Sequence, residues 1–214
     1  MDALCWENAL IGYGKKTILC DVNVRVPAGG FALVYGENGS GKTTLVKSLR
    51  EGRLLLGGSL KVDPSLKAGI AYIPQQSAVQ TFFPLSIFDT VAMGLSASGG
   101  ITGSLRPVDH RRVMAVLEQL NLAAKPRQLL GECSGGEIKK TLLGRALIKE
   151  PRLLIMDEPL VNVDDASRKT ILESVVSRHR QQGMTVLLIS HGHQDFAHHA
   201  SHRFHVHQGG VHAE

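Results

Sequence analysis

Apolar residues recur along the chain with two different periods, and each period predicts a different kind of element. Alternation of apolar and polar residues over 4–26 predicts antiparallel strands joined by a turn at 12–16. Short apolar runs predict buried strands, and apolar residues spaced three to four apart predict helices. Further strands are expected at 31–35, 57–62, 69–73, 152–156, 185–189 and 204–207. Helices are expected at 42–49, 86–94, 109–122, 134–150 and 165–182.

The order of these elements predicts an α/β protein. Strands and helices alternate in the first and last thirds of the chain, which is typical of a mostly parallel sheet covered by helices. We therefore expect a single domain over 1–214, in which 1–75 and 134–214 form the α/β core with an N-terminal antiparallel β subdomain. Residues 76–133 are expected to form a helical subdomain inserted into that core, with a glycine- and serine-rich loop at 96–104.

Composition bears on the cellular compartment of the protein. At 214 residues the chain is long enough to bury a core, and its longest apolar run, around 186–189, has the length of a strand. The N-terminus has neither a basic segment nor a long apolar stretch, so we expect no signal peptide. Three unevenly spaced cysteines imply no disulfide framework and fit a reducing cytosol.

The distribution of charge argues against nucleic acid as a partner. The net charge of +5 comes from 24 basic and 19 acidic residues, the basic residues are scattered, and aromatic residues make up 5% of the chain. There is neither a basic stripe nor a stacking platform, so nucleic acid is not an expected partner. The same charge fits a nucleotide or an anionic membrane surface.

A glycine-rich segment between the strand at 31–35 and the helix at 42 has the residues of a phosphate site. It has the pattern Gly-x-x-x-x-Gly-Lys-Thr, and we call it the phosphate loop (residues 36–43). Glycines permit backbone angles that direct successive N–H groups at one anion. Lys42 is expected to bind the β- and γ-phosphates, and the Thr43 hydroxyl to be a ligand of Mg²⁺. The candidate nucleotide contacts are Gly36, Glu37, Asn38, Gly39, Ser40, Gly41, Lys42, Thr43 and Thr44.

Two acidic residues follow the strand at 152–156. Carboxyl ends of parallel strands face the crevice where a phosphate loop on a neighbouring strand opens. Asp157 is therefore expected to hold Mg²⁺, directly or through water, and Glu158 to accept a proton from the water that attacks the γ-phosphate. A simple Asp-Glu-Pro turn is the alternative, which the phosphate loop disfavours.

A second anion-binding surface is expected at the start of the helix at 134. Ser134 and Glu137 have the spacing of a capping box, while Gly135 and Gly136 expose backbone N–H groups at the positive end of the helix. Because one nucleotide needs one cradle, we expect this surface to meet a nucleotide held by another subunit.

With these segments in this order, the chain resembles the nucleotide-binding subunit of an ATP-binding-cassette (ABC) transporter over nearly its whole length. In that family 36–43 is the Walker A motif, 133–137 the signature sequence and 153–157 the Walker B motif. The resemblance implies a P-loop NTPase core with ATP and Mg²⁺ as cofactors. It also implies roles for four further residues: Tyr13 stacks on adenine, Gln75 contacts Mg²⁺ and links the site to a membrane partner, Asp164 lies in the D-loop, and His191 contacts the γ-phosphate.

Departures from the family pattern are few and point to a subgroup. Cys133 replaces the leucine that usually begins the signature sequence, and the D-loop at 160–164 lacks the common serine at its second position. This D-loop and the segment at 83–94 resemble those of importers for zinc, manganese and related metals.

The resemblance also implies partners. Two copies, or one copy and a second ATPase subunit, would close head to tail on two ATP molecules and drive an integral-membrane permease. An importer would add an extracytoplasmic solute-binding protein, and the chain would lie at the cytoplasmic face of the membrane.

Histidines are concentrated near the C-terminus. His198 and His202 are four residues apart, a spacing that chelates a metal when it lies on a helix, and His205 and His207 are expected on one face of a strand. Metal binding by these four residues is one hypothesis. A solvated strand face that binds no metal is the other, and no carboxylate or cysteine completes a ligand set.

Three other functions remain open from the sequence. The chain could serve an ABC exporter or an importer of another solute, which use the same ATPase. It could be a soluble ABC ATPase of DNA repair or translation, although these usually carry paired cassettes or long insertions. It could be a silent nucleotide- or metal-binding regulator, against which Lys42, Asp157, Glu158 and His191 are all present.

Overall fold

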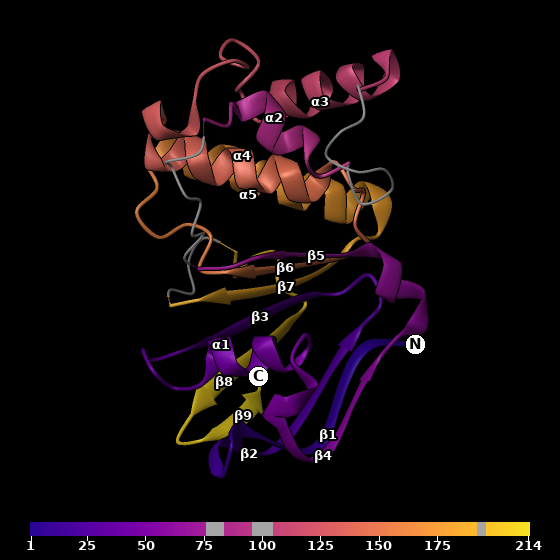
Figure 1. The fold of residues 1–214 in the computed structure, drawn as a ribbon. Helices are drawn as coiled ribbons and strands as arrows, with labels where there is room; N and C mark the ends of the chain where they lie inside the picture. Colours follow the sequence, from indigo (N-terminus) through magenta and orange to yellow (C-terminus); the bar gives the residue numbers. More distant parts are fainter. Residues whose placement is uncertain (76–83, 96–104, 192–195) are drawn as a thin grey trace. The chain divides into compact units, whose positions relative to one another are not determined.

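The computed structural model describes residues 1–75, 84–95, 105–191 and 196–214 (Figure 1). The chain forms two compact units. The first unit consists of Met1–Ile70, Arg152–Glu158 and Arg178–Glu214, and the second of Ala71–Pro151 and Pro159–Ser177.

The first unit contains an antiparallel sheet in which β1 (Asp2–Tyr13) lies between β2 (Lys16–Pro27) and β4 (Leu55–Val62). Alternation explains this sheet, because Val22, Val24 and Val26 of β2 are buried while the residues between them are exposed. The predicted antiparallel β subdomain and its turn are confirmed.

A second sheet of the first unit has the order β6 (Leu153–Asp157), β7 (Thr185–Ser190), β3 (Phe31–Gly36), β8 (His202–His207) and β9 (Gly210–Ala213). The first four of these strands are parallel, and β9 is antiparallel to β8. β6 is buried throughout, and β3 and β7 are buried up to their last residues, which explains their unbroken apolar sequences. The helix α1 (Lys42–Ser48) follows β3.

The second unit is mainly helical. It contains α2 (Ile87–Ala92), α3 (Pro107–Gln119), α4 (Gly135–Leu147) and the first part of α5 (Asp165–Gln182). β5 (Ile70–Ile73) begins at its boundary, and a short 3₁₀ helix lies at Leu130–Glu132; two others, Gly52–Leu54 and Pro64–Gly69, belong to the first unit. Gly144 of α4 permits close packing, because a Cβ there would lie 2.9 Å from Leu120 and 3.0 Å from Val91.

Most predicted elements are confirmed, with small shifts at their ends. α3 begins at Pro107 instead of residue 109 because proline suits the first turn of a helix, and α4 ends at Leu147 instead of residue 150. α4 and the start of α5 group with the helices of the second unit, so the single domain over 1–214 stays a prediction. The predicted loop at 96–104 lies outside the described residues.

The mixed fold, with a mostly parallel sheet, an antiparallel N-terminal sheet and helices, agrees with the sequence-based expectation. Within the described ranges, no helix combines the length and the apolar character needed to cross a membrane.

Candidate functional site

The phosphate loop adopts a backbone that only glycine permits at two points. Gly36 has φ 149° and Gly41 has φ 110°. A Cβ on Gly36 would clash with the carbonyl oxygen of Val206, and one on Gly41 would lie 2.8 Å from a methyl group of Leu19. The loop is therefore held closely against β8 and β2, and its shape depends on the absence of these side chains.

Lys42 reaches back over the phosphate loop. Its Nζ donates hydrogen bonds to the carbonyl oxygens of Gly36 at 2.9 Å and Glu37 at 2.7 Å. It also lies 3.5 Å from Nδ1 of His191. Burial lowers the pKa of Lys42, and the neighbouring carboxylates Glu158 and Asp157 oppose that decrease. A buried ammonium group is thus positioned where phosphates would meet the loop.

Asp157 ends β6 and is almost completely buried, with 1% of its surface exposed. Neither carboxylate oxygen has a hydrogen-bond partner among the described residues. Burial raises the pKa of Asp157, and the nearby Thr43 hydroxyl and Lys42 partly offset that increase. Two unpartnered buried oxygens beside a hydroxyl are suitable ligands for a hard cation, so this pair fits Mg²⁺.

Glu158 lies next to Asp157 and contacts His191. Its side chain is 4% exposed, its φ is 51°, and its backbone N–H donates to the carbonyl oxygen of Ile189 at 2.9 Å. Nε2 of His191 forms an ion-pair contact with a carboxylate oxygen of Glu158. Lys42, His191 and Glu158 are thereby joined in series within the first unit, at the carboxyl ends of β3, β7 and β6.

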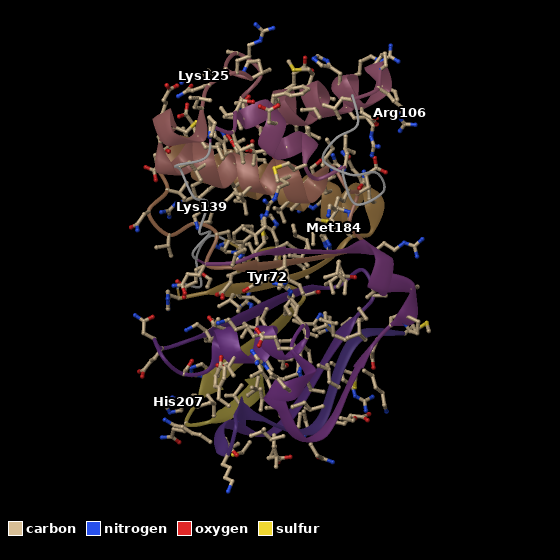
Figure 2. All side chains as sticks on the ribbon, in the orientation of Figure 1. Tyr72, Arg106, Lys125, Lys139, Met184 and His207 are labelled. Atoms are coloured by element: carbon tan, nitrogen blue, oxygen red, sulfur yellow. The ribbon has the colours of Figure 1, made fainter. Side chains whose placement is uncertain are left out.

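The start of α4, in the second unit, has the predicted capping box. Ser134 Oγ accepts from the N–H of Glu137 at 3.2 Å, and the Glu137 carboxylate accepts from the N–H of Ser134 at 2.9 Å. Lys125 donates to the same carboxylate at 2.8 Å, and this bond is the main reason that the pKa of Glu137 is lowered (Figure 2 labels Lys125).

The D-loop residue Asp164 lies against Gly136, at the start of α4. A Cβ on Gly136 would clash with the Asp164 carboxylate and would lie 2.5 Å from Ser167 Oγ. Asp164 in turn accepts from the N–H of Ser167 at 2.9 Å, at the start of α5. Within the second unit the structure therefore brings together Ser134, Gly135, Gly136, Glu137 and Asp164.

Gln75 ends the described part of the chain before residue 84. Its backbone oxygen accepts from Nζ of Lys139 at 3.2 Å, and both residues belong to the second unit (Figure 2 labels Lys139). The roles of Gln75 in Mg²⁺ binding and in contact with a membrane partner stay predictions.

Tyr13 is the last residue of β1 and is 48% exposed, which leaves its ring accessible for stacking. A cavity of about 450 Å³ is lined by the start of β2, the phosphate loop and the turn between β8 and β9. Its lining residues are Thr17, Ile18, Glu37, Asn38, Gly39, Ser40, His207, Gln208 and Gly209. Sequence reasoning missed the contribution of the β8–β9 turn to this cavity.

The histidine-rich tail differs in part from expectation. His198 lies in a turn and His202 begins β8, so these two residues do not share a helix. His205 and His207 do share a strand face, with ring centroids 5.5 Å apart. Among the described residues, no group of three His, Cys, Asp or Glu side chains could hold a metal ion. Metal binding by His198, His202, His205 and His207 stays a prediction.

Comparisons with known proteins agree with this geometry. The family model described as "ABC transporter" matches residues 19–161. The zinc transport system ATP-binding protein TroB of Treponema pallidum is 34% identical over 197 residues, which cover 89% of this chain and 73% of the relative. The manganese transport system ATP-binding protein MntB of Bacillus subtilis is 29% identical over 191 residues, which cover 86% of this chain and 75% of the relative.

Solved structures show the same fold. The ADP conformation of MJ1267, an ATP-binding cassette of an ABC transporter, has a TM-score of 0.81 and 24% identity, and covers 99% of this chain and 89% of that chain. The dimeric post-hydrolysis state of the cassette MJ0796, bound to ADP and Pi, has a TM-score of 0.84 and 19% identity, and covers 99% of this chain and 97% of that chain.

Proposed function

Because the chain belongs to the ABC transporter family and is an ATPase cassette of that family, we propose that it powers import of a divalent metal such as zinc or manganese through a membrane permease. The observation that carries the ATPase role is the gathering of Lys42, Asp157 and Glu158 beside the phosphate loop. The names of the relatives TroB and MntB support a metal as the transported solute.

The motif residues of the first unit have defined tasks in ATP hydrolysis. The phosphate loop and Lys42 bind the β- and γ-phosphates, and Tyr13 stacks on adenine. Thr43 and Asp157 would hold Mg²⁺, which when bound neutralises charge on the phosphates.

The chemical step needs a base beside the γ-phosphate. Glu158 accepts a proton as the oxygen of a water molecule attacks the γ-phosphorus and the bond to the β-phosphate oxygen breaks. His191 contacts Glu158 in this structure. We expect His191 to exchange that contact for the γ-phosphate when ATP binds, which releases Glu158 to act on water.

The second unit supplies the partner surface. The backbone N–H groups of Gly135 and Gly136 lie at the start of a 13-residue helix, beside Asp164. A single nucleotide is already held by one phosphate loop, so this surface is best used on the nucleotide of a second copy. We infer a head-to-tail dimer, or a pair with another ATPase subunit, at the cytoplasmic face of a membrane beside a permease.

The test is ATP turnover by the chain assembled with its permease and a solute-binding protein in lipid. We expect turnover to rise when zinc or manganese is loaded onto the binding protein, and to be lost in Glu158→Gln. Stimulation by a different solute alone would overturn the metal assignment. Absence of ATP hydrolysis by the wild-type assembly under all loadings would overturn the ATPase role.

A further inference from the structure

The β8–β9 hairpin forms one wall of the cavity beside the phosphate loop. His207, Gln208 and Gly209 lie on one side of this space, Thr17 and Ile18 on another, and the tip of the phosphate loop on the third. Its volume of about 450 Å³ is in the range of small-molecule sites. None of the nucleotide-binding motifs discussed above includes this hairpin, which Figure 2 locates by its label on His207.

The position of the hairpin is fixed by backbone contacts. β8 runs parallel to β3, with Val206 paired to Gly36, so His207 directly follows the residue opposite the start of the phosphate loop. The N–H of Cys20 donates to the carbonyl oxygen of Gly209 at 2.7 Å, which ties the turn to β2. The wall therefore moves with the loop and the strand that it faces.

The His207 ring is also oriented by its neighbours. It stacks on His205, with 5.5 Å between ring centroids and 17° between ring planes. His205 stacks in turn on Tyr35, with 4.8 Å between centroids and 4° between planes. This stack limits the freedom of an otherwise exposed imidazole, so a contact made by His207 loses little side-chain entropy.

The chemistry of the lining indicates which part of a ligand belongs there. Hydroxyl, amide and imidazole groups line the cavity, Ile18 is its apolar side chain, and Glu37 brings a carboxylate that disfavours a further phosphate group. Adenine stacked on Tyr13 and phosphates on residues 36–43 would leave the sugar between them, next to Thr17. Ribose hydroxyls donate and accept hydrogen bonds, as do imidazole and amide side chains.

On these grounds we propose that His207 and Gln208 bind the ribose of the nucleotide held by the phosphate loop. The proposal rests on the proposed function, because it assumes that ATP binds to residues 36–43. It adds the β8–β9 hairpin to the nucleotide site as a wall that recognises the sugar.

Calorimetric titration of the full chain tests this assignment. The ligands are Mg-ATP, its 2′-deoxy and 3′-deoxy analogues, and Mg-tripolyphosphate, which lacks sugar and base. We expect His207→Ala to weaken ATP binding about three- to tenfold, as for the loss of one net hydrogen bond. We expect His207→Ala to leave the affinity for tripolyphosphate unchanged. For at least one deoxy analogue, the substitution should weaken binding less than it does for ATP.

Two further variants keep the test independent of folding. Gln208 has φ 49°, a backbone angle that glycine adopts readily, so Gln208→Gly removes the side-chain amide without backbone strain. This variant should also bind Mg-ATP more weakly while binding Mg-tripolyphosphate like the wild type. His212→Ala removes a histidine of the same hairpin that does not line the cavity, and should bind ATP like the wild type.

The outcomes separate the two proposals. If the wild type does not bind Mg-ATP, the proposed function fails. If the wild type binds but His207→Ala and Gln208→Gly bind equally well, the ribose assignment is overturned. Equal weakening of ATP and tripolyphosphate would overturn it too, because the hairpin would then act through the phosphate loop.

Discussion

Replacing Asp157 by asparagine should stabilise the protein while disabling it. The carboxylate is 1% exposed and neither oxygen has a described hydrogen-bond partner, so its charge is buried without full compensation. An uncompensated buried polar group costs about 1–3 kcal/mol, and more when charged. The asparagine side chain would keep the shape but lose the charge, and Lys42 would lose one favourable neighbour. We expect a net gain of about 1–2 kcal/mol in the free energy of unfolding at pH 7.

The pH dependence of that gain has a definite sign. Burial raises the pKa of Asp157 in the folded state, so folding disfavours the charged carboxylate. The penalty is absent below the pKa of the unfolded chain, near 3.9, where the group is protonated in both states. It develops as pH rises above that value and is complete once pH exceeds the raised folded-state pKa. The advantage of Asp157→Asn should therefore grow as pH rises from 4 and be larger at pH 7 than at pH 4.

Urea unfolding with and without Mg-ATP measures both the gain in stability and the loss of ligand binding. Without ligand, the midpoint of Asp157→Asn should exceed that of the wild type at pH 7 and approach it at pH 4. Ligand at 100 times its Kd adds about 2.7 kcal/mol to the wild type. The variant should gain less, because its amide no longer offers Mg²⁺ a charged oxygen. A variant that is no more stable than the wild type at pH 7 would refute the reasoning.

Three further changes test other parts of the molecule. Glu158→Gln should lower ATP turnover by about 10²–10⁴-fold with ATP affinity retained, measured as phosphate release and by calorimetry; unchanged turnover would exclude it as the base. Gly136→Ala should lower the free energy of unfolding by about 1–3 kcal/mol, because the new methyl group meets Asp164; an unchanged Tm would contradict the packing. Trp6→Phe should lower the free energy of unfolding by about 1 kcal/mol, because it removes the 3.1 Å hydrogen bond from Nε1 to Ser48 Oγ. Equal stability of the two proteins in urea unfolding would contradict a stabilising role for this bond.

The parts of the site that could be predicted from sequence are those carried by contiguous residues. The phosphate loop combines its glycines, Lys42 and Thr43 within one segment, so its chemistry follows from local order. The capping box at Ser134 is local in the same way, and the structure has both of its bonds.

The parts that could not be predicted depend on pairing between distant strands. His207 lines the cavity because β8 lies beside β3, a contact that no local pattern encodes. His198 and His202 are four residues apart, a spacing that brings two side chains together only on a helix. The chain turns at His198 and enters β8 at His202, where Phe204 and Val206 alternate inward with exposed or half-buried histidines. The period of two in these residues outweighs the four-residue spacing.

From the contacts of the first unit we expect ATP to bind weakly to a single copy and more tightly in the proposed dimer. Lys42 donates to its own loop and lies beside His191, and His191 contacts Glu158. These bonds partner the charged groups within the chain, so ATP would have to replace them and would gain only the difference. The N–H groups of Gly135 and Gly136 of a second copy lie in the first turn of α4, where backbone N–H groups have no partner within the helix. In the proposed dimer, their contribution would be added only when two copies close on one nucleotide, so nucleotide and dimer would stabilise each other by the same free energy.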